Sequence, residues 1–100
     1  MKQIKLFALV GSFAEDKDAA AKLRRDVILP LLKKGESLEI DFAGITLTTQ
    51  SFIHALISQA LRQEGEEVLA RMKFKNCGIA VRGIIETVVQ YVLESVDGDG

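Results

Sequence analysis

The alternation of apolar and polar residues divides this chain into segments typical of strands and segments typical of helices. Residues 38–42 and 72–75 alternate with a period of two, which predicts two strands. Residues 4–10 are rich in strand formers, and only Lys5 interrupts their apolar character. We therefore expect another strand there, the first in the chain, covered on both of its faces.

A first helix is expected over residues 18–34, where apolar residues recur on one stripe at about 100° per residue. Pro30 lies inside this pattern and cannot donate a backbone hydrogen bond, so it should kink or end the helix there. Gly35 follows as a natural stop, since glycine readily adopts the left-handed conformation that ends helices. Residues 11–18, which carry Phe13, are expected to form a loop.

Two more helices are predicted in the second half of the chain. One begins after Thr48 or Thr49, whose hydroxyl can accept an unpaired backbone N–H, and it stops at Gly65. The other extends over residues 79–95, and a single helical turn is expected over residues 66–71.

These segments give the order β-α-β-α-β-α, with connections long enough to be helices. We predict a small α/β layer fold with a mostly parallel sheet of three to four strands and helices mainly on one face. The other face is expected to stay partly open or to be capped by Phe13 and the loops. Residues 1–96 are expected to form a single domain, and residues 97–100 a frayed, disordered acidic tail.

Composition excludes several classes of protein. The 100 residues are 48% hydrophobic with a formal net charge of -1, so the chain has no basic excess with which to bind nucleic acid. One cysteine and one histidine cannot supply the roughly four ligands of a structural zinc site, and we expect no metal and no cofactor. No apolar run approaches the ~20 residues of a membrane span, so a cytoplasmic protein that does not bind membranes is expected.

Two candidate nucleophiles have plain structural alternatives. Ser51 and His54 lie three residues apart on one helix face, but no acidic residue follows at Ser58 or Arg62 to orient the histidine. His54 is therefore interpreted as a surface or contact residue, and we expect no enzyme. Cys77 precedes a helix start, which can lower the pKa of a thiol, or it is a small buried residue that lets strand and helix pack closely.

Residues with hydroxyl groups crowd the entrance to the helix that begins near residue 50. A phosphate added there would meet the positive end of the helix and change the local charge by about -1.5 to -2. Plain capping and turn chemistry is the alternative. The residues concerned are Thr46, Thr48, Thr49 and Ser51.

The last predicted helix has a wider apolar arc than docking onto a core requires. Its apolar residues span about 200°, against the ~100° stripe of a helix with one buried face. Complete burial within the monomer and a dimer or partner surface both explain this excess. The arc comprises Val81, Ile84, Ile85, Val88, Val89, Val92, Leu93 and Val96.

The middle of the chain resembles a known family. It is similar to the strand–loop–helix signature of STAS domains, the anti-sigma-factor-antagonist-like domains, in Asp41-Phe42-Ala43-Gly44-Ile45-Thr46 and then Thr49-Gln50-Ser51-Phe52. More closely, it resembles a bacterial STAS-like family of unknown function, in which a later strand ends as Phe74-Lys75-Asn76-Cys77 does here. The resemblance covers residues 38–96 well and residues 11–32 loosely.

This resemblance implies a regulatory role. In anti-sigma-factor antagonists, an Asp-Ser pair at the start of the second helix carries the phosphorylated serine. A serine kinase with a histidine-kinase-type ATPase fold modifies that serine, and phosphorylation blocks binding to the kinase. The pair falls at Thr49-Gln50 in this chain, so Ser51 or Thr49 is left as the candidate phosphate acceptor.

The sequence therefore predicts a non-enzymatic regulatory module that docks a protein partner, such as an ATPase, a kinase or an anti-sigma-like regulator. A homo-oligomeric structural module and a small-ligand or nucleotide sensor are the alternatives, and a homodimer would form through the last helix. The implied partner-binding surface comprises Thr46, Thr48, Thr49, Gln50, Ser51, His54, Ala55 and Ser58.

Overall fold

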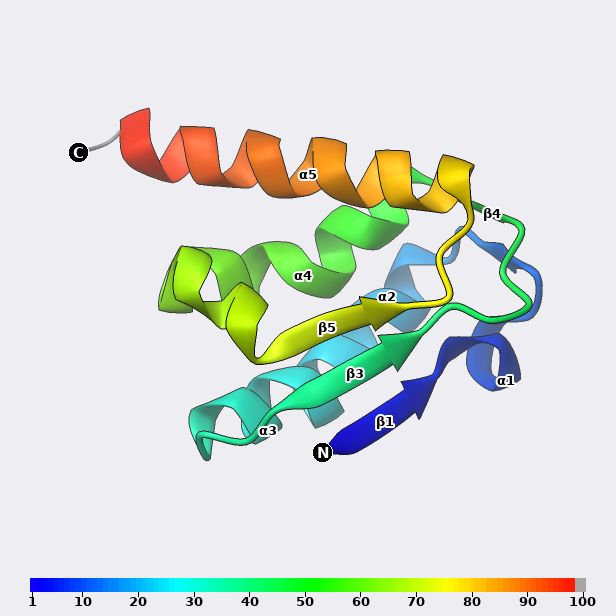
Figure 1. Ribbon diagram of the computed structural model, residues 1–100, viewed down its shortest axis with the longest axis horizontal. Coiled ribbons are helices and arrows are strands. Elements are labelled where there is room, and N and C mark those ends of the chain that lie inside the picture. The colour runs from blue at the N-terminus through cyan, green and yellow to red at the C-terminus, as the bar shows by residue number, and fades with distance from the viewer. Residues whose placement is uncertain (99–100) are drawn as a thin grey trace.

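The computed structural model describes residues 1–98, with the side chains of residues 1–95. Its main sheet has three parallel strands in the order β1-β3-β5, which are Lys2–Lys5, Leu38–Asp41 and Met72–Lys75 (Figure 1). The register places Ile40 beside both Ile4 and Phe74. The predicted α/β class and the parallel pairing of neighbouring strands are confirmed.

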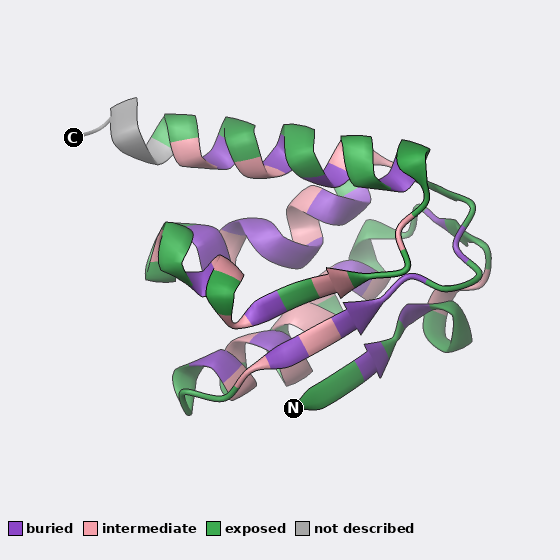
Figure 2. Cartoon of the chain, in the orientation of Figure 1, coloured by how far each residue is buried: buried purple, intermediate pink, exposed green. Residues whose placement is uncertain are grey.

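Helices cover one face of this sheet, and the other face is open (Figure 2). Successive residues of a strand point to opposite faces, so Ile4 and Ile40 are buried against the helices. On the open face, Glu39 accepts a hydrogen bond from Gln3 (3.5 Å) and forms an ion pair with Lys75 (3.1 Å). The expectation of helices on one face is confirmed, whereas a first strand covered on both faces was wrong.

The first strand ends at Lys5, and Leu6–Val10 forms the short helix α1 instead of continuing it. Lys5 pairs with Asp41, the last residue of β3, so a longer β1 would have no neighbour for its backbone groups. Leu6 is the one buried residue of α1, and Leu9 is exposed. The prediction of a strand to residue 10 was wrong because the length of the partner strand, and not local composition, decides where pairing stops.

One helical segment extends from Lys17 to Lys33. It consists of α2 (Lys17–Leu23), a π-helical turn η1 (Arg24–Ile28) and α3 (Leu29–Lys33). In η1 the Leu29 N–H donates to the carbonyl of Arg24, five residues back, which inserts one residue into the regular helical repeat.

Pro30 does not end this helix, although the sequence predicts a kink or an end at this residue. The π-helical turn ends at Ile28, two residues before the proline, and the helix continues to Lys33. Gly35 then ends it as predicted, with φ of 81°. The N–H groups of Gly35 and Glu36 donate to the carbonyls of Leu32 and Leu31, each at 3.0 Å. These two hydrogen bonds are the pattern of a Schellman motif.

The central helix α4 (Gln50–Glu64) has the bounds that the sequence predicts. The Thr49 hydroxyl accepts the Phe52 N–H at 3.1 Å and caps its start, and Gly65 adopts φ of 77° at its end. The helix packs between α2 and α5. Its buried residues are Phe52, Ile53, Leu56, Ile57, Ser58, Ala60 and Leu61.

The long helix α5 (Ile79–Gly98) lies along α4 on the outside of the molecule (Figure 1). Its last turn includes Asp97 and Gly98, which were assigned to a tail, and residues 99–100 lie outside the described residues. Much of its wide apolar arc is covered by the monomer. Val81, Ile85, Val88 and Val92 are buried, and Ile84, Val89 and Leu93 are half-buried.

Two features between the main elements complete the fold. The predicted turn near residue 66 is the 3-10 helix η2 (Glu66–Ala70). A second parallel pair, β2 (Phe13–Ala14) with β4 (Leu47–Thr48), lies beyond the carboxyl ends of the main strands, where the sequence had suggested a loop (Figure 1). Within residues 1–98, no helix combines the length and the apolar character that crossing a membrane requires.

Candidate functional site

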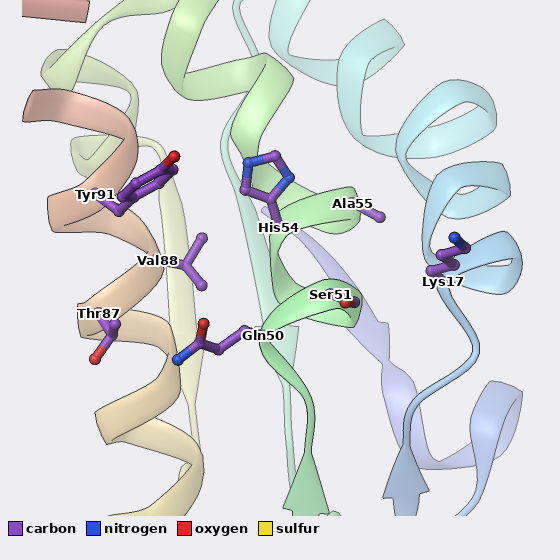
Figure 3. A pocket seen from close by; sticks show the side chains of 8 residues that line it. All are labelled: Lys17, Gln50, Ser51, His54, Ala55, Thr87, Val88 and Tyr91. Atoms are coloured by element: carbon purple, nitrogen blue, oxygen red, sulfur yellow. The ribbon is translucent and has the colours of Figure 1, made fainter. Parts of the chain in front are cut away.

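A cleft of about 450 Å³ opens between three helices, beside the first two turns of α4 (Figure 3). Its volume falls within the ~300–1,000 Å³ that is usual for binding pockets. Four of the residues proposed from sequence as a docking surface line it together. The lining comprises Lys17 from α2, Gln50, Ser51, His54 and Ala55 from α4, and Thr87, Val88 and Tyr91 from α5.

The side chains divide between the two walls of the cleft. Ser51 and Ala55 point toward Lys17 on the α2 side, whereas Gln50 points toward the α5 side, and His54 lies between them (Figure 3). Spacings of three and four residues place Ser51, His54 and Ala55 on one strip of the helix. Ser51 is exposed, and His54 and Ala55 are half-buried.

Ser58, which continues this strip by one turn, is not part of an exposed face. Only 5% of its surface is accessible. Because α4 packs against α2 on one side and α5 on the other, its buried arc is wider than the sequence pattern indicated. The exposed part of this strip therefore ends near Ala55, and the expectation that Ser58 belongs to an exposed face was wrong.

Three hydroxyls at the entrance to α4 already have structural partners. Thr46 donates to the Ser12 carbonyl at 3.3 Å, and Thr48 donates to the Ala14 carbonyl at 2.8 Å, across the β2–β4 pair. Thr49 is half-buried and caps α4. Ser51, in contrast, is exposed within the cleft. Turn and capping chemistry thus accounts for the threonines.

The two sequence motifs behind the STAS resemblance meet in a hydrogen bond at the carboxyl end of the sheet. Asp41 Oδ1 accepts from the Asn76 side chain and from the Ala43 N–H, both at 2.9 Å. These bonds hold the pKa of Asp41 below its ordinary value. Asn76 itself has φ of 57°, a conformation that asparagine tolerates better than most residues.

A family model described as a STAS-like domain of unknown function (DUF4325) matches residues 19–82, which include Asp41, Asn76 and all of α4. The chain belongs to this STAS-like family. No curated protein and no solved structure matches the chain. The matched region supplies the α4 wall of the cleft, whereas Lys17 and the α5 residues Thr87 to Tyr91 lie outside it.

Within this STAS-like domain, Ser51 and His54 share the cleft without a carboxylate among the lining residues. Activation of a serine by histidine uses a third group, usually a carboxylate, to orient the imidazole. None of the described lining residues carries a carboxylate. Among residues 1–98, no group of three or more His, Cys, Asp or Glu side chains is arranged to hold a metal ion.

Cys77 fits the packing interpretation better than the reactive one. Its side chain is half-buried, and its thiol lies 3.9 Å from the Lys75 carbonyl. Burial raises the pKa of the Cys77 thiol, and the charge of Arg82 offsets this only in part.

An exposed apolar pair that the sequence pattern does not reveal adjoins the entrance to α4. Phe13 and Leu47 are register partners on β2 and β4, and they are 45% and 54% exposed. Strands of two residues carry no periodicity, so nothing in the pattern could reveal this pairing. The available signal was the apolar character of both residues in segments read as loops.

Proposed function

We propose that this STAS-like domain is a non-enzymatic regulatory module that docks a protein partner through the cleft beside α4. The observation that carries the proposal is the convergence of Gln50, Ser51, His54 and Ala55 in one cleft, since the same residues follow from the family resemblance. Polar but uncharged side chains predominate on the α4 wall, so a partner can cover it without burying unpaired charges.

The exposed pair Phe13 and Leu47 extends the proposed surface. Leu47 lies four residues before Ser51, and β4 leads through Thr49 directly into α4. A few well-packed side chains near the centre of an interface, aromatic ones prominent among them, supply most of its binding free energy. The proposed surface thus combines apolar anchors on β2 and β4 with polar positioning groups on α4.

The partner that the resemblance favours is a serine kinase with a histidine-kinase-type ATPase fold, and Ser51 is the acceptor we assign to it. Thr49 is less suited, because its hydroxyl caps α4. Transfer of the γ-phosphoryl group of ATP to Ser51 Oγ would release ADP and the hydroxyl proton. The product would place about -1.5 to -2 charges in the cleft, and a partner that covered the neutral α4 wall would have to desolvate this charge, which weakens binding.

Affinity capture from extracts of the source cells, read by mass spectrometry, tests this proposal. The domain would be compared with a Ser51→Glu, His54→Glu variant and with an Arg62→Glu, Gln63→Glu control at the exposed far end of the same helix. A kinase or regulator retained by the native protein and the control, and lost by the first variant, supports the proposal. Equal retention by all three proteins contradicts it.

A small-ligand or nucleotide sensor is the second candidate, because the cleft has the volume of a small-molecule pocket and Lys17 on its wall can pair with an anion. A thermal-shift screen with ATP, ADP and GTP tests it. A ligand that binds the folded state stabilises it by RT ln(1 + [L]/Kd), so the melting temperature should rise with concentration. No shift at millimolar nucleotide would exclude these ligands.

A further inference from the structure

A second concave surface lies on the other flank of α5 from the cleft. It is a groove of about 580 Å³ between α5 and the segment formed by η2 and β5. Its floor is apolar and consists largely of half-buried side chains that belong to the edge of the core. These are Leu69, Phe74, Cys77, Ile85, Val89 and Leu93, with Glu66, Arg82, Glu86, Gln90 and Glu94 around the rim.

The groove runs beside a free strand edge. β5 pairs with β3 on one side and has no strand on its other side within residues 1–98. The carbonyl of Arg71 accepts from Leu38 of β3 at 2.7 Å, and the carbonyl of Lys75 accepts from Phe42, directly after β3, at 2.8 Å. Because alternate residues of a parallel ladder bond to the same neighbour, the backbone groups of Met72 and Phe74 turn to the free edge.

A strand added at this edge would present two different faces. Its inward side chains would enter the apolar groove beside Phe74, and its outward side chains would lie next to Lys73 and Lys75. Acidic residues at inward positions would instead meet a rim on which three carboxylates, Glu66, Glu86 and Glu94, outnumber the one cation, Arg82. The charges around the groove and on the lysine face therefore determine how residues of the added strand alternate, with apolar residues toward the groove and acidic residues toward the lysines.

We propose that β5 is a docking edge for an extended peptide segment of a partner protein that alternates apolar with acidic residues. Such strand addition uses main-chain hydrogen bonds for affinity and side-chain pockets for selectivity. A second copy of this chain fits less well. Antiparallel pairing of two β5 strands about Phe74 would set Lys73 opposite Lys75 of the other copy, and like charges directly opposite are destabilising.

Selection of a phage-displayed library of random 12-residue peptides on the native protein tests this proposal. Enriched sequences should alternate apolar residues with Asp or Glu. On binding, the Met72 and Phe74 amides should become protected from hydrogen exchange, while the Lys73 and Lys75 amides, already bonded to β3, should change little. Enrichment of basic peptides, enrichment of helical apolar spacing, or no enrichment would overturn the proposal.

Two lysine variants make the test specific. Lys73→Glu should weaken an enriched acidic peptide by up to about fivefold, the effect of one cross-strand pair. Lys5→Glu, on the opposite edge strand of the same open face, should leave its affinity unchanged. Equal effects of both variants would indicate nonspecific attraction and contradict docking at β5. Protection of the Met72 and Phe74 amides without peptide, in a protein that sediments as a dimer, would assign the edge to a second copy.

Discussion

The side-chain amide of Asn76 donates to the carboxylate of Asp41 at 2.9 Å, and this bond joins residues 35 positions apart in the chain. Asp41 ends β3 and Asn76 follows β5, so the bond ties the ends of neighbouring strands together. The same carboxylate oxygen holds the Ala43 N–H at the start of the next turn. Both residues belong to motifs that resemble STAS-domain sequences, and the structure gives those motifs a shared architectural role.

This bond predicts a specific loss of stability in acid. Hydrogen bonds from Asn76 and from the Ala43 N–H lower the pKa of folded Asp41. The stabilisation is therefore fully present above the unfolded value of about 3.9, and it is lost as the pH falls through the lower folded value. Urea unfolding between pH 2 and 7 should show a smaller decline below pH ~4 in Asp41→Asn than in the native protein. Parallel curves for the two proteins would contradict this assignment.

Substitution of Asn76 separates its hydrogen bond from its backbone conformation. Asn76→Gly keeps φ of 57° accessible and loses the bond to Asp41, whereas Asn76→Ala loses both. We expect the alanine variant to melt at a lower temperature than the glycine variant, and both below the native protein. If the glycine variant matches the native protein in thermal denaturation, the bond contributes nothing measurable.

A pair of glycine variants tests the close approach of α1 to the turn after β3. Gly44 and Gly35 have φ of 87° and 81°, but a Cβ on Gly44 would lie 2.7 Å from the ring of Phe7, whereas one on Gly35 would meet open space. Alanine at Gly35 should cost roughly 1–2 kcal/mol for the left-handed conformation alone. Alanine at Gly44 should cost more in urea unfolding, and Phe7→Ala should remove the excess. Equal costs at the two glycines would mean that the ring of Phe7 moves away freely.

The start of α4 gives a prediction about capping and charge. Thr49→Ala removes the cap and should cost about 0.5–2 kcal/mol in chemical denaturation. Ser51→Asp places a negative charge in the first turn and should stabilise by about 0.3–1 kcal/mol at low salt, with Ser51→Ala near neutral as its control. This pattern would show that a charge on Ser51 leaves the helix intact. Destabilisation by Ser51→Asp would mean that a phosphate acts by melting the helix instead.

The rotation of α4 can be checked with two neighbouring side chains. Phe52 is fully buried, so Phe52→Ala should cost roughly 3–5 kcal/mol. His54 borders the cleft, and His54→Ala should change the free energy of unfolding by no more than about 0.5 kcal/mol. Similar large losses in both variants would contradict the observed orientation of the helix.

Local signals explain what the sequence predicted correctly. The cap at Thr49, the stops at Gly35 and Gly65 and the alternation in β3 and β5 each depend on a few neighbouring residues. The failures have distant causes. Residues 6–10 became helical because β3 ends opposite Lys5.

The residues of the candidate site also divide into those that local sequence predicts and those that only tertiary packing brings together. Gln50, Ser51, His54 and Ala55 could be grouped from helical spacing, because they lie on one element. Lys17 and Tyr91 join them only through the packing of α2 and α5 against α4, which no local pattern encodes. Ser58 was misassigned for the same reason, since two flanking helices widen the buried arc.

The π-helical turn η1 determines which residue of α2 borders the cleft. Its extra residue rotates everything before it by about 100° relative to α3, which the Schellman stop anchors. Arg24, at the start of this turn, donates to the Ala55 carbonyl at 3.0 Å and holds the rotated segment against α4. Deletion of one residue from Arg24–Ile28 would restore a regular helix but turn Lys17 away from Ser51. The positive charge at this wall of the cleft thus depends on the rotation of α2 about its axis as well as on the presence of a lysine at position 17.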